Sequence, residues 1–131
     1  MPIVHIFLAE ERTSEFNKAL IERVSGAIVE TGCGPIEKVR ITIQSPPYVA
    51  LDGPTNPVSP NGRVDGNHFP RLDLFLIEGR PSHVTEALME RLKAILVEVG
   101  CGSLDQVKAS IQQIPSTAWG IGGKTAQELG R

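Results

Sequence analysis

The sequence contains two copies of one stretch. Residues 2–44 read PIVHIFLAEERTSEFNKALIERVSGAIVETGCGPIEKVRITIQ, and residues 70–112 read PRLDLFLIEGRPSHVTEALMERLKAILVEVGCGSLDQVKASIQ. With an offset of 68 and no gap, 18 of the 43 aligned positions are identical, whereas chance would give about three at ordinary residue frequencies. The chain is therefore a tandem duplication of a unit that is too small to bury much of a core alone.

Each copy carries the same spacing of apolar residues. They alternate near both ends of the copy, which predicts two strands, and recur every fourth residue in between, which predicts an amphipathic helix. In the first copy these residues are Val4, Ile6, Leu8, Phe16, Leu20, Val24, Ile28, Val39, Ile41 and Ile43. Thr13 and Ser14 are expected to begin the first helix. The helices are expected to end at glycines, which are Gly32, Gly34, Gly100 and Gly102.

A strand, a helix and a strand in this order predict a parallel pair joined by a right-handed crossover. Two such units predict an α/β fold, a two-layer sandwich in which a four-stranded sheet carries both helices on one face. The first unit is expected over residues 1–44. The second is expected over residues 70–131 and includes a glycine-rich hairpin at Gly120–Gly123, followed by a brief tail helix. The first copy is expected to lack that hairpin.

Residues 45–69 connect the two units. They hold five of the ten prolines of the chain, together with several turn dipeptides such as Asn61-Gly62. A connection of this length is unusual in a compact domain. It is interpreted either as a linker laid over the surface or as a lid or oligomer contact.

The sheet face away from the helices is expected to carry Ile3, His5 and Phe7 of the first copy and Arg71, Asp73, Phe75 and Ile77 of the second. A two-layer sandwich leaves this face uncovered. Another subunit is the simplest cover for it, so we expect an oligomer.

The composition excludes several classes of partner. The chain has 131 residues with 13 Lys and Arg against 15 Asp and Glu, a net charge of -2. It therefore lacks the basic excess of a nucleic-acid-binding protein. No apolar run approaches the roughly 20 residues that span a bilayer, and the start lacks the pattern of a secretory signal. We expect a cytoplasmic protein with no nucleic-acid or membrane partner.

Pro2 follows Met1 directly. Removal of Met1 would leave a proline with a free secondary amine, whereas the nitrogen of an internal proline is a non-basic amide. Such an amine can act as a general base if burial and nearby cations lower its pKa toward neutrality. Pro70 occupies the matching position inside the chain and cannot act in this way.

Cations recur at matching positions in the two copies. Arg12 and Arg80 stand just before the helices, and Arg40 and Lys108 are expected in the middle of the last strands, on the face opposite the aliphatic residues. Paired cations suit a small carboxylate, which arginine can bind with two hydrogen bonds. The alternative is that Arg12 and Arg80 are solvated surface charges. Trp119 is the one tryptophan and is either a core residue or part of a site.

No cofactor is expected. Cys33 and Cys101 each stand in a Gly-Cys-Gly tripeptide. The duplication explains them better than a disulfide, and two cysteines without further ligands do not predict a metal site. The histidines show no ligand spacing, and no phosphate-binding fingerprint opens a helix. No chemistry is assigned to the two tripeptides.

With these features together, the chain resembles the tautomerase superfamily, and more specifically 4-oxalocrotonate tautomerase, in a fused, tandem form. The matching segments are Pro2–Ile6, Val39–Ile41, Ile77–Arg80 and Gly120–Gly123, and the resemblance covers most of the chain outside residues 45–69. It implies a proton-transferring isomerase that ketonises a 2-hydroxy-dienoate or a related enol or keto acid such as 2-hydroxymuconate. It also implies a homotrimer, equivalent to a hexamer of single units.

The resemblance implies roles for individual residues. Pro2 is the general acid/base, Arg80 is the partner cation with Arg12 in reserve, and Arg40 or Lys108 comes from another subunit. Trp119 stands where the family usually has phenylalanine, and Trp119 and Ile77 would contact the substrate. Since Pro70 cannot replace Pro2, one complete site is expected per chain.

Two other functions stay open at this point. Fused relatives include 3-haloacrylate dehalogenases and malonate semialdehyde decarboxylases, which generally place an acidic residue near the hairpin to activate water. Here Trp119 stands in that region, with Glu128 further along. The other alternative is a catalytically silent assembly module, to which Lys108 in place of an arginine and the diverged residues 45–69 would point.

Overall fold

Each copy forms the expected strand–helix–strand unit. The computed structural model describes residues 2–8, 12–45, 49–50, 57–58, 70–100, 104 and 107–130. The first unit consists of β1 (Ile3–Phe7), α1 (Ser14–Glu30) and β2 (Arg40–Gln44). The second unit consists of β5 (Arg71–Ile77), α2 (Ser82–Glu98) and β6 (Lys108–Ile114). Thr13 caps α1 as expected, because its hydroxyl oxygen accepts a hydrogen bond of 3.1 Å from the backbone N–H of Phe16.

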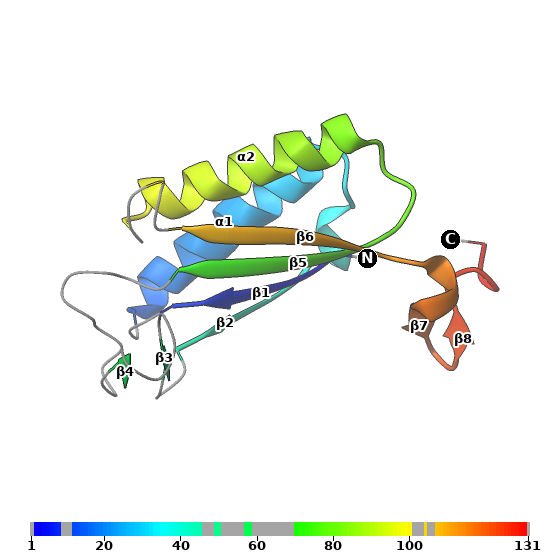
Figure 1. Ribbon diagram of the computed structural model, residues 1–131, viewed down its shortest axis with the longest axis horizontal. Coiled ribbons are helices and arrows are strands. Elements are labelled where there is room, and N and C mark those ends of the chain that lie inside the picture. The colour runs from blue at the N-terminus through cyan, green and yellow to red at the C-terminus, as the bar shows by residue number, and fades with distance from the viewer. Residues whose placement is uncertain are drawn as a thin grey trace.

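The four long strands form one mixed sheet in the order β2-β1-β5-β6. The strands within each unit are parallel, and the units join through the antiparallel pair β1 and β5. Ile3 lies opposite Phe75, and Phe7 lies opposite Arg71. Since an offset of 68 converts one pairing into the other, an approximate twofold rotation relates the units. Both helices cover the same face of the sheet (Figure 1), which confirms the predicted two-layer fold.

The core lies between the sheet and the helices. Alternate residues of the two central strands point into it and are almost fully buried: Val4, Ile6, Leu8, Leu72, Leu74 and Leu76. The helices supply the opposite wall, chiefly through Leu20, Val24, Leu88 and Leu92. Each such side chain stabilises the fold by about 1.5–3 kcal/mol relative to its exposed state. Neither unit could bury these strands alone, because each supplies one helix and half of the sheet.

Two ion pairs, also related by the duplication, join the helices. Arg23 of α1 pairs with Glu98 of α2, and Arg91 of α2 pairs with Glu30 of α1, with 2.7 Å between Arg91 Nη2 and Glu30 Oε2. All four side chains are about half exposed. Exposed pairs contribute little, so these contacts add to helix packing without dominating it.

Replacing both carboxylates (Glu30→Gln with Glu98→Gln) should therefore lower the Tm only slightly at low salt, since each exposed pair is worth about 1 kcal/mol or less. The difference from the wild type should shrink further at high salt, which screens the wild-type pairs. Thermal unfolding at both salt concentrations checks this. A large loss of Tm that persists at high salt would show that the helices depend on these pairs.

A short hairpin follows the second unit. A 3₁₀ turn at Ser116–Ala118 leads into β7 (Gly120–Ile121) and β8 (Lys124–Thr125), which pair antiparallel. Gly122 and Gly123 have φ of 57° and 84°, the left-handed conformation that this two-residue turn needs. The predicted tail helix is wrong. Residues 126–130 form a turn that ends at Gly130, whose φ of 74° is left-handed and does not continue a helix.

A short ladder also lies in the connection between the two units. The backbone of β3 (Val49–Ala50) pairs antiparallel with that of β4 (Pro57–Val58). Since this ladder falls within residues 45–69, it does not test the expectation that the first unit, residues 1–44, lacks the glycine-rich hairpin. A ladder needs only backbone groups, so it can form where side chains have diverged. The two ladders lie beyond opposite ends of the sheet (Figure 1). Most of residues 45–69, and with them the expected lid or contact, lie outside the described residues.

Candidate active site

Pro2 lies at the end of the sheet where β5 finishes. Because β1 and β5 are antiparallel, the start of β1 is adjacent to the end of β5, which is followed by Glu78–Arg80. The Pro2 ring is fully buried, and its carbonyl oxygen accepts a hydrogen bond of 3.0 Å from the N–H of Arg40. The backbone of Pro2 is thus held against β2, at the end of the sheet where β5 finishes.

Arg80 lies at this same end. Its Nη1 donates to the carbonyl oxygen of Ile77 and its Nη2 to that of Cys33, each at 2.9 Å. Its Nε is buried and makes no hydrogen bond to the described residues. Gly79, with φ of 120°, provides the turn after β5 that brings the arginine back toward the first unit. The guanidinium therefore bridges the two copies.

Arg12 lies at the opposite end of the sheet. It follows β1 in the chain, and β1 finishes where β5 begins, beside Pro70 and Arg71. The Arg12 guanidinium carbon lies 4.8 Å from the centre of the Phe16 ring, within cation–π range. Within one chain, the antiparallel pairing of β1 with β5 therefore places Arg80, and not Arg12, at the Pro2 end of the sheet.

Arg40 and Lys108 begin their strands. Arg40 is the first residue of β2 and Lys108 the first of β6, so the expected mid-strand position is wrong for both. In both units the pairing of the last strand begins at this residue, because the N–H groups of Arg40 and Lys108 bond to the carbonyls of Pro2 and Pro70. Both side chains are exposed, and they lie at opposite ends of the sheet.

Trp119 packs in an apolar cluster and also faces a pocket. It is 8% exposed and packs with Ile77 and Ala126 in a second apolar cluster, apart from the main core. It also lines a pocket of about 400 Å³. The residues that line this pocket come from β1, β5, β6 and the hairpin: Ile3, Phe75, Ile114, Ala118, Trp119 and Gly120. The hairpin thus forms an apolar wall at the Pro2 end of the sheet.

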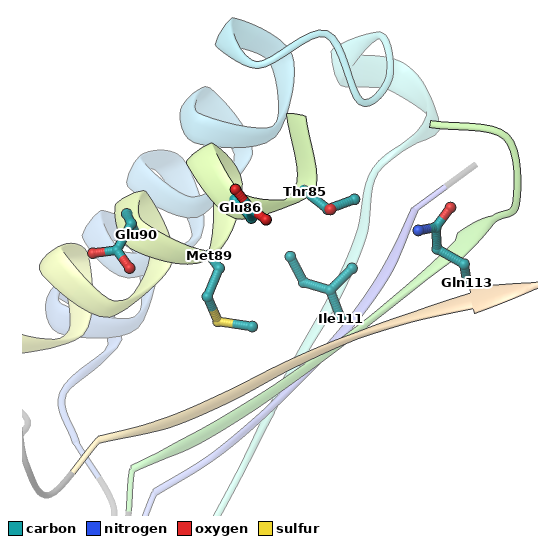
Figure 2. A pocket seen from close by; sticks show the side chains of 6 residues that line it. All are labelled: Thr85, Glu86, Met89, Glu90, Ile111 and Gln113. Atoms are coloured by element: carbon teal, nitrogen blue, oxygen red, sulfur yellow. The ribbon is translucent and has the colours of Figure 1, made fainter. Parts of the chain in front are cut away.

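A separate hollow lies between α2 and β6 (Figure 2). It has a volume of about 260 Å³ and is lined by Thr85, Glu86, Met89, Glu90, Ile111 and Gln113. Met89 and Ile111 point toward each other across it (Figure 2). Its ionisable lining residues are two carboxylates, which would repel an acidic substrate. This hollow does not suit the small carboxylate that the paired cations suggest.

A third hollow, of about 370 Å³, lies at the Pro70 end of the open sheet face. Arg71 Nε lies 3.2 and 3.1 Å from the two carboxylate oxygens of Asp73, and Ser110 Oγ donates to Asp73 Oδ1 at 2.7 Å. The alternation of the strand predicts Arg71 and Asp73 on this face, whereas no local pattern predicts that they pair. The first copy has Ile3 and His5 at the matching positions, so the two ends of the sheet differ chemically.

Glu128 is the carboxylate that the water-activating alternatives would use. Its Oε2 accepts from the N–H of Thr125 at 3.4 Å, while Thr125 Oγ1 accepts from the N–H of Glu128 at 3.2 Å. These reciprocal bonds engage the side chain in the local turn. Nothing in this arrangement directs the carboxylate to the Pro2 ring.

Among the described residues, no group of three or more His, Cys, Asp and Glu side chains is placed to hold a metal ion. None of the described helices is long and apolar enough to cross a membrane. Cys33 is a free, buried thiol, and Cys101 lies outside the described residues.

Known proteins resemble both the half-length unit and the whole chain. The 2-hydroxymuconate tautomerase of Pseudomonas putida is 37% identical over 63 residues, which are 48% of this chain and all of that protein. A solved fused 4-OT, described as an asymmetric trimer, is 30% identical with a TM-score of 0.82 and covers 98% of this chain and 99% of its own. A protein solved after inactivation by 2-oxo-3-pentynoate is 25% identical with a TM-score of 0.80 over the same shares. No family model matches the chain.

The fold, the duplication and these relatives define a proton-transferring isomerase built from two small β-α-β units. The chain belongs to the tautomerase superfamily, as a fused form of 4-oxalocrotonate tautomerase.

Proposed function

We propose that the Pro2 amine is the general acid/base of this tautomerase and that the substrate is a 2-hydroxy-dienoate such as 2-hydroxymuconate. The observation that carries the proposal is the placement of Pro2 and Arg80, from different copies, at one end of the sheet beside the Trp119 pocket. The P. putida relative is named for the same substrate. The proposal requires removal of Met1, since the nitrogen of Pro2 is otherwise an amide.

The reaction needs one proton carrier. The neutral amine takes the proton of the 2-hydroxyl group as the C2–O bond becomes a carbonyl, and the electrons of the diene move toward a distal carbon. The protonated amine then delivers the proton to that carbon, so that the keto isomer has the same formula as the substrate. Burial of the ring and the nearby Arg80 cation should both lower the pKa of the amine, which keeps part of it neutral near pH 7.

The cations and the apolar wall have separate tasks in this proposal. Arg80 binds a carboxylate or the developing oxyanion, and its buried Nε is still available as a donor. Arg40 of a neighbouring subunit, or Lys108 in its place, binds the other end of the acid, because both side chains are exposed on the open face. Trp119 and Ile77 exclude water from the diene. Pro70 has an amide nitrogen, so each chain holds one complete site.

We also propose that the chain forms a homotrimer. The open sheet face carries the half-buried Ile3, Phe7 and Phe75, and the fused relative is described as a trimer. Contact between open faces would bring cations of one subunit toward the site of another. Light scattering coupled to size-exclusion chromatography measures the number of chains.

The substrate class is tested by two assays on one preparation that begins at Pro2. Ketonisation of 2-hydroxymuconate, followed as loss of dienol absorbance, is expected. Halide release from a 3-haloacrylate is not, because the Glu128 carboxylate is engaged with Thr125. Halide release without ketonisation would assign the chain to the dehalogenase alternative.

Ligand binding should change the fluorescence of Trp119, because this residue is the one tryptophan of the chain and lines the proposed pocket. A saturating change is expected on titration with a dicarboxylate that cannot tautomerise, and Arg80→Ala should weaken it. A monoamine of similar size serves as the control. No change with the dicarboxylate would place binding away from the hairpin.

A further inference from the structure

The turn that ends α1 contacts both groups assigned to the reaction. Gly32 has φ of 79°, and its N–H bonds to the carbonyl of Val29 while that of Cys33 bonds to the carbonyl of Ile28, each at 3.0 Å. This pair of bonds is the Schellman arrangement, which fixes the path of the chain just after a helix. The Cys33 side chain is fully buried in the core. The backbone at residues 33 and 34 is therefore held in place.

The two adjacent residues of this turn face different catalytic groups. The Cys33 carbonyl accepts from Arg80 Nη2 at 2.9 Å. Gly34 lies against the Pro2 ring, and a Cβ at residue 34 would lie 3.0 Å from Pro2 Cδ and 3.1 Å from Pro2 Cγ. Pro2 Cδ is bonded to the amine nitrogen itself. Any side chain at residue 34 would thus displace the ring next to its reactive atom.

We infer that Cys33 and Gly34 are positioning residues that set the separation of the Pro2 amine from the Arg80 cation. The inference rests on the proposed function, in which these two groups act together. Cys33 acts through its carbonyl, which fixes the guanidinium. Gly34 acts through its missing side chain, which lets the ring pack against the same turn. The Gly-Cys-Gly tripeptide of the first copy would thus position both groups of the proposed site.

Gly34→Ala tests the inference, with Gly26→Ala as the matched control. An alanine Cβ at residue 34 must push the Pro2 ring away from the turn that holds Arg80. The weaker repulsion between the cations should raise the pKa of the Pro2 amine. A misplaced base should lower kcat by about ten- to a hundredfold, with a smaller effect on KM. Gly26 lies within α1 with nothing within 4 Å of an added Cβ, so its variant should match the wild type in both properties.

The pKa is read by nitrogen-15 NMR on protein labelled at proline and prepared to begin at Pro2, because the other nine of the ten prolines have amide nitrogens that do not titrate. This titration needs no substrate. If the wild type fails to turn over any dienol, the proposed function fails, while the titration still tests the positions of the two groups. Equal pKa values in Gly34→Ala, Gly26→Ala and the wild type would overturn the inference.

A second experiment covers a Gly34→Ala protein that fails to fold. In Arg80→Ala the carbonyls of Cys33 and Ile77 are left without their donor. Added guanidinium, a planar cation with forked donors, should lower the pKa of the Pro2 amine toward the wild-type value. Tetramethylammonium, which has no donors, should not. Equal effects of the two cations would show that the carbonyls do not position the charge.

Discussion

Replacing Pro2 by alanine is expected to lower kcat/KM for 2-hydroxymuconate ketonisation by about 10²–10⁴-fold, the usual contribution of a positioned general acid/base. The alanine nitrogen would still be basic once Met1 is removed. It would be a primary amine without the ring that is buried against Gly34 and fixes the position of the nitrogen. Loss of dienol absorbance measures the rate, and intact mass confirms that residue 1 is absent.

Two further proteins separate the amine from the ring. Pro70→Ala changes the equivalent residue of the second copy, whose nitrogen is an amide, and should retain most of the activity. A protein with one extra residue before Pro2 keeps the ring but converts its nitrogen into an amide, and should be nearly inactive. Wild-type rates in that extended protein would remove Pro2 from the mechanism.

Arg80→Ala is expected to cost about 10²–10³-fold in kcat, as the loss of one donor to a developing oxyanion typically does. KM should rise as well if the guanidinium also binds a substrate carboxylate. Arg80→Lys should recover little, because an ammonium cannot bond the Ile77 and Cys33 carbonyls in the same forked geometry.

Arg12→Ala is the matched comparison for Arg80. Arg12 is the duplicated equivalent but lies at the Pro70 end of the sheet. Its loss should therefore change kcat much less than the loss of Arg80. Kinetics of the two variants under the same conditions make the comparison. A greater loss with Arg12→Ala would mean that another subunit's Arg12 serves the Pro2 site, and that the assembly differs from the one proposed.

The units themselves could be predicted because their signal is local and occurs twice. The spacing of Val4, Ile6 and Leu8 is repeated by Leu72, Leu74 and Leu76, and all six are buried as expected. The features that the sequence does not predict fall where side-chain pattern carries little information. The β3–β4 ladder depends on backbone pairing, and residues 126–130 turn once without continuing as a helix.

The site was harder to predict because it joins residues far apart in the sequence. The choice between Arg12 and Arg80 depends on the antiparallel pairing of β1 with β5, which no local pattern encodes. The sequence presents Cys33 as a thiol, whereas its contact with Arg80, 47 residues away, is made by its carbonyl. The close approach of Gly34 to Pro2 likewise becomes visible only once the helix end and the strand start are placed.

The central claim is that one reactive proline amine per chain, at Pro2, performs the chemistry. A relative was inactivated by 2-oxo-3-pentynoate, an electrophilic ynone that an amine can attack by conjugate addition. We expect this compound to inactivate the present protein with one adduct per chain, mapped by peptide mass spectrometry to Pro2. Inactivation with the adduct on another residue, or full activity with Pro2 modified, would contradict the claim.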